Sequence, residues 1–452
     1  MGRTFAEELE ALVALGPEGL GVFAASLDAT WIEEGLRATG KASVRRRKFP
    51  AEQAVWLVVG MGLFADRSIQ AVVEHLGLVV PGTTSLAPSA IPKARYRVGP
   101  EPLRWLFEKV SAAWRDTPGA GGYKGLTLYA VDGVCVRVQD SDENFAYFGK
   151  PGGRNGQGDA GYPQLRAACL MNLDNRMLVD ARMGPYATGE QTLARQLWPQ
   201  VPAASLVILD RGYFEYALFA GLLDDGDDRH LLLRLRSNIK YEELESLPDG
   251  TLLVRIRPCS SALKASPGIR ESITGRIVAY HHPGGKPGRL FTTLLDPALY
   301  PAEELVTLYH ERWEIELGYD ELKTHLLERK ECLRSKKPEG VEQEFWGLLV
   351  AYNLIRREML LAAQEHGLPP KRISFRGALL WLRNLWVVTA WLSSPGTLPR
   401  HLADFRASLD ILVLPPRRSK RRYPRHVKIK MSKYKRNRGR RLQSQQTSGS
   451  ER

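Results

Sequence analysis

The stretch PAEELVTLYHERWEIELGYDELKTHL, Pro301–Leu326, is the part of the chain from which the fold can be worked out. Pro301 suits a first helical turn, acidic residues follow it, and no second proline interrupts the segment. Leu308, Ile315 and Leu322 recur every seven residues and would anchor one face to a core. The pattern therefore predicts one long helix with a buried face and a polar face beside it.

The polar face of this helix carries a carboxylate, two cationic groups and a phenol. At about 100° per residue, four polar side chains fall within about 60° of one another: Tyr309, Arg312, Glu316 and Lys323. A carboxylate beside two cations and a phenol suits a metal ion next to a phosphodiester. For an arbitrary charged helix, a solvated face is the usual alternative.

The spacing of these four residues is specific. Tyr309-x2-Arg312-x3-Glu316-x6-Lys323 matches the Y-(2)-R-(3)-E-(6)-K signature of bacterial insertion-sequence transposases of the DDE type, the "insertion sequence four" family. Four fixed residues at fixed spacing arise by chance on the order of once in 10⁵ windows. The chain therefore resembles that family.

Composition bounds the class of protein. A chain of 452 residues with 44% hydrophobic residues favours two or three domains with a sizeable core. No apolar run is long enough to cross a bilayer, and the acidic N-terminal stretch is unlike a signal peptide. The four cysteines are scattered, which argues against disulfides and zinc ribbons. We expect a cytoplasmic, nucleoid-associated bacterial protein without a membrane partner.

The net charge of +14 is concentrated near the C-terminus. Residues 417–441 contain fourteen Lys or Arg and no acid, and Glu451 cancels Arg452, so residues 1–416 are formally neutral. A neutral body with a cationic tail favours nucleic acid as the partner. A tail that is only solubilising is the alternative.

The N-terminal region, 1–117, has a helical pattern. The segments Ser68–Leu78 and Ser89–Gly99 resemble a helix-turn-helix whose second helix presents Lys93, Arg95 and Arg97 to DNA. The residues alone fit an ordinary helical bundle with a basic edge equally well. The family resemblance favours a DNA-end-binding domain.

Beyond a linker at Pro118–Gly125, the pattern changes to strands. Three antiparallel strands, a helix, a central strand at Ser205–Asp210 and a second helix are the order of an α/β ribonuclease-H-like core, with a hairpin that turns at Asp174-Asn175. The predicted regions follow the chain: 1–117 helical and DNA-end-binding, 118–223 first part of the core, 224–300 β-rich insertion, 301–335 catalytic helix that completes the core, 336–412 C-terminal helices, and 413–452 basic, flexible tail.

Three carboxylates occupy the positions that phosphodiester chemistry needs. Asp132 follows a first strand, Asp210 ends the central strand, and Glu316 lies on the long helix. Alone, Asp132 before Gly fits a turn and Asp210 fits a helix cap. Together they match the DDE triad of the family, which implies that they bind two Mg²⁺ ions, with Mn²⁺ as a possible substitute.

The other residues of the signature have supporting roles by the same resemblance. Arg312 and Lys323 would hold phosphates near the scissile bond, and Tyr309 would donate to a phosphate or stack on a sugar. Their alternative role is to neutralise Glu316 or its neighbours. Both roles can apply at different steps.

One feature departs from part of the family. Some members place a flipped base on a Trp in the β-rich insertion when they form a DNA hairpin. This chain has no Trp between Trp198 and Trp313, and the candidates that could replace it are Tyr241, Tyr280 and Phe291. The use of a hairpin stays open. His281-His282 before a proline fits a turn better than a zinc site.

The sequence predicts a cut-and-paste transposase. It would bind double-stranded DNA at terminal inverted repeats, cleave the element ends to expose a 3′-OH, and join that 3′-OH to target DNA, as a homodimer in the synaptic complex. The alternatives are a catalytically silent, domesticated DNA-binding protein and a nuclease that cuts without joining. The repeat sequence and the target preference are not encoded in any recognisable motif.

Overall fold

The structure is a computed structural model that describes residues 27–42, 49–76, 78, 87, 89–115, 122–151, 161–280, 287–327, 332–392, 406 and 412–414. Residues Met1–Leu414 form one compact unit and Pro415–Arg452 a second. Almost all of the predicted tail therefore lies outside the described residues, and so does His281-His282. Within the described part, none of the helices combines the length and apolar composition that a membrane crossing needs.

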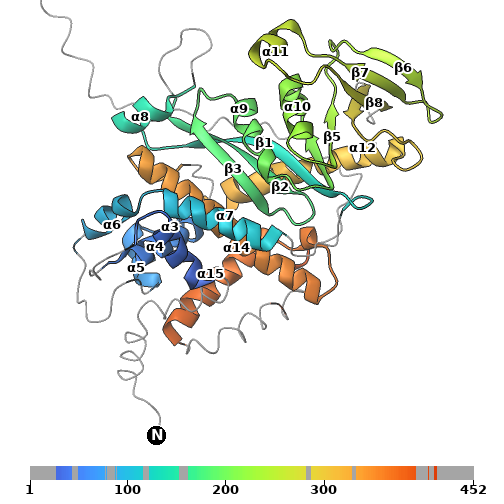
Figure 1. Cartoon of the computed structure of the whole chain (residues 1–452). Helices are drawn as coiled ribbons and strands as arrows, with labels where there is room; N and C mark the ends of the chain where they lie inside the picture. Colours follow the sequence, from blue (N-terminus) through green and yellow to red (C-terminus); the bar gives the residue numbers. More distant parts are fainter. Residues whose placement is uncertain are drawn as a thin grey trace, which may run out of the picture. The chain divides into compact units, whose positions relative to one another are not determined.

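A nine-stranded mixed sheet forms the centre of the first unit (Figure 1). Its strand order is β3-β2-β1-β4-β5-β9-β8-β7-β6. The strands are β1 (Thr127–Arg137), β2 (Gln164–Asn172), β3 (Leu178–Pro185), β4 (Ser205–Leu209), β5 (Arg229–Arg234), β6 (Glu242–Ser246), β7 (Leu252–Ile256), β8 (Ile273–Tyr280) and β9 (Gly288–Thr292).

The first five strands have the order of a ribonuclease-H-like core. β1, β2 and β3 are an antiparallel meander, while β4 pairs parallel with both β1 and β5. The predicted hairpin is confirmed, because β2 and β3 are joined across residues 173–177. β1 runs straight through Asp132-Gly133, since Gly133 pairs with Ala168 inside the ladder, so this Asp-Gly pair does not form a turn.

The structure corrects the start of the β-rich insertion. Residues 229–234 were predicted to belong to it, but they form β5, the fifth strand of the core. Leu231, Leu232 and Leu233 are buried on both faces of the sheet, as parallel strands require. β9 then pairs with β5, so β6–β9 continue the core sheet instead of forming a separate one.

Helices cover both faces of the core sheet. Helices α9 (Glu190–Arg195) and α10 (Tyr216–Asp224) share an apolar cluster with Tyr129 and Val131 of β1. The catalytic helix and α14 (Pro338–Glu365) share the cluster on the other face, with Ala130 and Val134. Further helices are α8 (Asp142–Phe148), α11 (Ser260–Ala265) and α15 (Phe375–Leu392).

The N-terminal helices form a bundle that packs against α14. They are α3 (Ala29–Ala38), α4 (Ala51–Leu63), α5 (Ile69–His75), α6 (Ala90–Val98) and α7 (Glu101–Arg115). Helices α4, α6 and α7 contact α14, while α3 packs on α4 and α7, and α5 packs on α4. A Cβ at Gly347 would come 2.6 Å from Val58 Cγ1, so α4 and α14 approach as closely as glycine permits. These helices share one apolar cluster with the core, and packing therefore does not separate the predicted regions at 117 and 335.

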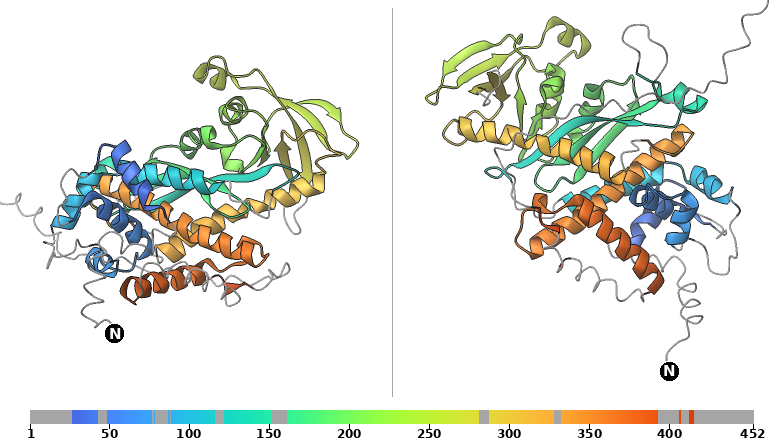
Figure 2. Two further views of the ribbon diagram at one scale, coloured as in Figure 1. Left: turned by 60° about the horizontal axis from the view of Figure 1, so that its bottom comes forward. Right: turned by 180° about the vertical axis from the view of Figure 1, so that it is seen from behind.

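The predicted long helix is present but not uniform. It consists of α12 (Ala302–Glu311), α13 (Trp313–Asp320) and the π-helical segment η4 (Glu321–Leu326), which follow one another in Figure 2 (right). Arg312 is the junction between α12 and α13. A π-helical turn is uncommon and is frequently found at functional sites.

Candidate active site

Two of the predicted carboxylates come together at one edge of the sheet. Asp210 follows the last residue of β4 directly. In the parallel β1–β4 pair, Val131 lies opposite Leu209, so Asp132 is the first residue of β1 beyond the end of β4. Both carboxylates therefore lie where the carboxyl end of a parallel strand opens a site.

Burial dominates the electrostatics of Asp132. It raises the pKa of this carboxyl group to about 6. The Gly133 amide, which donates to Asp132 Oδ1 at 2.8 Å, and the positive charge of Arg312 act in the opposite direction. The charges of Glu190 and Glu316 raise the pKa further. Asp132 is thus within electrostatic reach of Arg312 and of two more carboxylates.

Arg312 pairs with Glu316 and lies within electrostatic reach of Asp210. The residue is 9% exposed, and its guanidinium lies 2.9 Å from Glu316 Oε1. Burial lowers the pKa of Arg312, but the charges of nearby groups outweigh burial and raise it: Tyr309, Asp210 and Glu316. The structure therefore gathers the three predicted carboxylates around one buried cation.

The two remaining residues of the signature differ in position. Burial raises the pKa of Tyr309 to about 12, and the nearby charge of Arg312 partly opposes this rise. Lys323 lies on η4 and is half-buried. Among the described residues no hydrogen bond or ion pair joins Lys323 to the carboxylates, so its phosphate-binding role stays a prediction.

Buried polar contacts fix the catalytic helix to the sheet. Tyr319 of α13 donates to the carbonyl oxygen of Asp132 at 2.6 Å. Arg176, in the β2–β3 turn, donates to Glu314 at 2.6 Å and to Glu321 at 2.5 Å. Glu321 also pairs with Arg356 of α14. These contacts lie on either side of Glu316 along the helix and hold it in register against β1.

The oxygen donors suit a divalent cation. No group of three or more His, Cys, Asp or Glu in the described part of the chain is arranged to hold a metal ion by itself. Mg²⁺ is usually bound by one or two carboxylates together with substrate phosphates and water, so such a closed group is not required. A buried carboxyl group whose pKa is raised, as that of Asp132 is, would be stabilised as the anion by a nearby cation.

The three candidates for holding a flipped base have different surroundings. Phe291 is fully buried in the sheet and cannot receive a base. Tyr241 accepts from Arg289 at 2.8 Å. The ring of Tyr280 lies 6.5 Å from that of Tyr309, which places it nearer to the signature residues.

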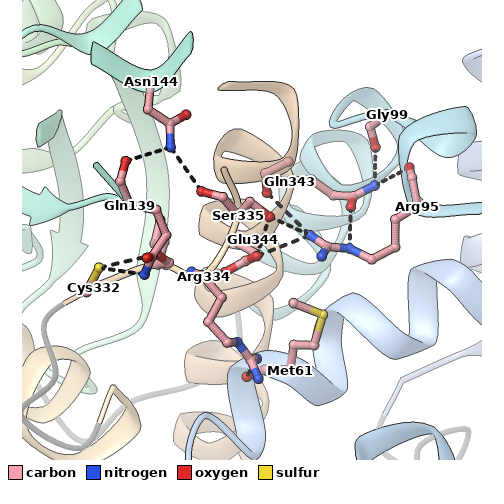
Figure 3. A network of polar contacts seen from close by, with 12 residues as sticks. Met61, Arg95, Gly99, Gln139, Asn144, Cys332, Arg334, Ser335, Gln343 and Glu344 are labelled. Atoms are coloured by element: carbon pink, nitrogen blue, oxygen red, sulfur yellow. Dashed lines mark hydrogen bonds and ion pairs between the residues drawn. The ribbon is translucent and has the colours of Figure 1, made fainter. Parts of the chain in front are cut away.

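The predicted DNA contact through Arg95 is wrong. Arg95 is 6% exposed, and its guanidinium donates to Gln343, Ser335 and Glu344 at 3.0–3.2 Å (Figure 3). A paired, buried guanidinium is not available to phosphate. Arg95 instead ties α6 to α14 across the chain.

The neighbours of Arg95 on α6 remain accessible. Lys93 and Arg97 are exposed on the face of α6 that does not pack on α14. Helical periodicity explains the difference, because Arg95 lies one residue after the buried Ala94 and turns inward with it. A DNA contact through Lys93 and Arg97 stays a prediction.

The sequence reasoning missed Glu190. Its carboxyl group lies directly over Gly133, since a Cβ at Gly133 would come 2.4 Å from Glu190 Cδ. Among the acidic neighbours of Asp132, Glu190 affects its pKa more than Glu316 does. An acidic residue in the first turn of the helix after the third strand was the only available signal.

A mixed sheet in this order, with one carboxylate within β1, one directly after β4 and one on a helix that packs on β1, defines an enzyme of metal-dependent phosphodiester chemistry. Comparison with known families agrees. Residues 17–108 match the family "Insertion element 4 transposase N-terminal", and residues 123–354 match the family "Transposase DDE domain". The chain belongs to the insertion element 4 family of DDE transposases, whose catalytic domains use divalent metal ions.

Individual relatives support this assignment. The chain is 36% identical over 410 residues to the transposase InsG for insertion sequence element IS4 of Escherichia coli (strain K12), covering 90% of this chain and 92% of the relative. It is 32% identical over 259 residues to the putative transposase InsZ of the same strain, covering 55% and 83%. A piggyBac transposase synaptic complex with hairpin DNA is similar at 11% identity and a TM-score of 0.40, covering 89% and 85%, a likeness too distant to inform function.

Proposed function

We propose that this transposase moves its element by a cut-and-paste reaction. It binds the terminal inverted repeats, cleaves at the element ends to expose a 3′-OH, and joins that 3′-OH to target DNA. The observation that carries this proposal is the grouping of Asp132, Asp210 and Glu316 around the buried Arg312. The similarity to InsG over most of both chains supports it.

Each side chain has a distinct part in the proposed reaction. Asp132, Asp210 and Glu316 would hold two Mg²⁺ ions, or Mn²⁺ in their place, and the chemistry that such ions supply is activation of an attacking oxygen and stabilisation of a leaving oxygen. Arg312 leaves Glu316 when DNA arrives and donates to the phosphate next to the scissile bond. Tyr309 and Lys323 hold adjacent phosphates.

DNA binding outside the active site uses the basic surfaces. The exposed Lys93 and Arg97 of α6 contact the terminal repeats, and the cationic stretch 417–441 adds affinity that does not depend on sequence. Two element ends must be held together before joining, so the active complex contains a homodimer. Such a protein would be found at the bacterial nucleoid.

A supercoiled plasmid that carries the two cognate element ends tests the proposal. With Mg²⁺, the protein should release the element and join it to a second plasmid, and Asp132→Asn, Asp210→Asn and Glu316→Gln should abolish both steps. Cleavage without joining would identify a nuclease. Binding to the ends without cleavage would identify a silent DNA-binding protein, and either result would refute the cut-and-paste reaction.

A further inference from the structure

A fourth carboxylate lies beside Asp132, on the face of the sheet opposite to the catalytic helix. Glu190 is in the first turn of α9, which packs on β1 and β2 (Figure 1). Gly133 has no side chain at the point where the two elements meet, and the carboxyl group of Glu190 fills the space that a Cβ would need. The chain thus brings Glu190 to β1 next to Asp132.

The Glu190 carboxylate has no counter-charge in the described part of the chain. No ion pair or hydrogen bond of its side chain is formed with any described residue. Its charge reaches Asp132 and raises the pKa of that group. Two acidic groups that repel each other in a half-buried place need compensation, and carboxylates arranged in this way commonly bind a cation.

A cavity of about 300 Å³ opens beside Glu190. Its lining residues are Arg166, Glu190, Gln191, Gly212 and Tyr213. Glu190 gives one wall a negative charge. Arg166, whose guanidinium stacks 4.5 Å from the ring centre of Tyr186, gives the other wall a positive charge. A cation bound to Glu190 and a phosphate oxygen bound to Arg166 would neutralise the charges on both walls of the cavity.

Tyr213 gives an independent indication of a ligand. It is 3% exposed, it lines the cavity, and its hydroxyl group has no hydrogen-bond partner among the described residues. Burial raises its pKa, and Asp132 and Glu190 are the charged groups that add most to the rise, so the phenol lies near both. A buried hydroxyl group without a partner is rare in proteins and indicates an ordered water or a ligand.

We propose that Glu190 is a metal ligand, and that it would hold a divalent cation together with Asp132 beside β1. The proposal rests on the metal-dependent function proposed above and adds a residue to it. The Tyr213 hydroxyl group would orient water toward such a cation, and Arg166 would neutralise a DNA phosphate that supplies a further oxygen.

Direct metal binding tests the proposal without DNA. The full-length protein is titrated with Mn²⁺ by calorimetry, beside Glu190→Gln and the matched control Glu143→Gln. Glu143 is an acidic residue in the first turn of α8, the position that Glu190 occupies in α9, but Glu143 is exposed and Glu190 is half-buried. Glu190→Gln should weaken one class of Mn²⁺ site by roughly tenfold or more, and Glu143→Gln should bind like the wild type.

Cleavage of end DNA gives the second readout. The Mg²⁺ concentration for half-maximal cleavage should rise in Glu190→Gln, while affinity for the DNA ends is retained. If Glu190→Gln does not fold by circular dichroism, Glu190→Asp keeps the charge but withdraws it by one methylene, and it should weaken Mn²⁺ binding in the same direction.

Wild-type Mn²⁺ binding in whichever variant folds would overturn the proposal. Weakened Mn²⁺ binding in a protein that cuts but does not join would support the Glu190 site and refute only the cut-and-paste reaction. The two proposals therefore fail separately.

Discussion

The buried guanidinium of Arg312 and the carboxylate of Glu316 form an ion pair at 2.9 Å. The pair keeps two charges compensated in a place where either alone would be costly. In the proposed reaction, where Glu316 binds metal and Arg312 binds phosphate, both side chains would exchange partners. Substituting Glu316 should therefore affect the reaction differently from substituting Arg312.

Glu316→Gln should abolish cleavage and spare DNA binding. The amide keeps the size of the side chain but removes the charge that a metal ligand needs, so the rate should fall by about 10²–10³ or more. Arg312→Ala should reduce both the assembly of the end complex and cleavage, because it removes a phosphate contact as well. A gel-shift assay beside a cleavage assay in Mg²⁺ measures both. Near wild-type cleavage by Glu316→Gln would contradict the triad assignment.

Arg95 and Arg97 lie on the same helix, but Arg95 is buried in an ion pair and Arg97 is exposed, so substituting each should change the stability of the protein differently. Arg95→Ala leaves Glu344 buried without its partner and should lower the free energy of unfolding by about 3–5 kcal/mol. Arg97→Ala should change it by no more than about 0.5 kcal/mol. Urea unfolding followed by circular dichroism compares the two, and equal losses would be inconsistent with the buried network.

Asp180 should make stability depend on pH. Burial raises the pKa of this carboxyl group to about 6, although Arg182 is 2.6 Å away. The folded protein therefore holds an extra proton between about pH 4 and pH 6. This proton alone should lower the free energy of unfolding by about 2–3 kcal/mol as the pH rises through this window, and it adds no further dependence above it.

Asp180→Asn provides the control for this dependence. The amide should remove the part of the slope that Asp180 contributes, while Asp132, whose pKa burial also raises to about 6, keeps its own part. It should stabilise the protein at pH 8 more than at pH 4. Chemical denaturation at both pH values measures the difference. The same slope in the variant and the wild type would assign it to another group.

The catalytic helix is held from both sides by buried ion pairs, and it changes from α to π geometry within them. Arg176 contacts Glu314 before Glu316 in the chain and Glu321 after it, where η4 begins. One side chain of the β2–β3 turn thus fixes two points of the helix. The register of Glu316 against Asp132 depends on this clamp.

Arg176→Ala should destabilise the protein and impair cleavage together. It leaves Glu314 without this buried partner and should lower the free energy of unfolding by about 3–5 kcal/mol. Arg137→Ala, at an exposed position of β1, is the control and should be close to neutral. If Arg176→Ala is as stable as Arg137→Ala, the clamp does not hold the helix.

Local sequence patterns predicted the helices and strands better than they predicted which residues contact one another in the fold. The helix at 301–326 and the strand that ends at Asp210 follow from periodicity and from apolar runs, which are properties of neighbouring residues. The burial of Arg95 depends on Glu344, which is 249 residues further along the chain. The place of Glu190 depends on how α9 packs on Gly133. No pattern within one segment carries such information.

The cationic stretch 417–441 is predicted to raise the whole molecule's affinity for DNA. Its fourteen Lys and Arg release counterions when they meet phosphate. Deleting 417–452 should flatten the slope of log affinity against log salt concentration for random duplex DNA. Binding measured by fluorescence anisotropy over a salt series tests this, and an unchanged slope would rule out the predicted role.

The close packing of α4 on α14 means that part of the nascent chain stays exposed during translation. On the ribosome, α7 is complete about 220 residues before α14 starts, which at about 5–20 residues per second is a delay of roughly 10–45 s. During that time Gly347, on which Val58 of α4 packs in the folded protein, has not yet been synthesised. The N-terminal helices therefore leave the ribosome with an apolar face that stays uncovered until α14, in the last quarter of the chain, has been made.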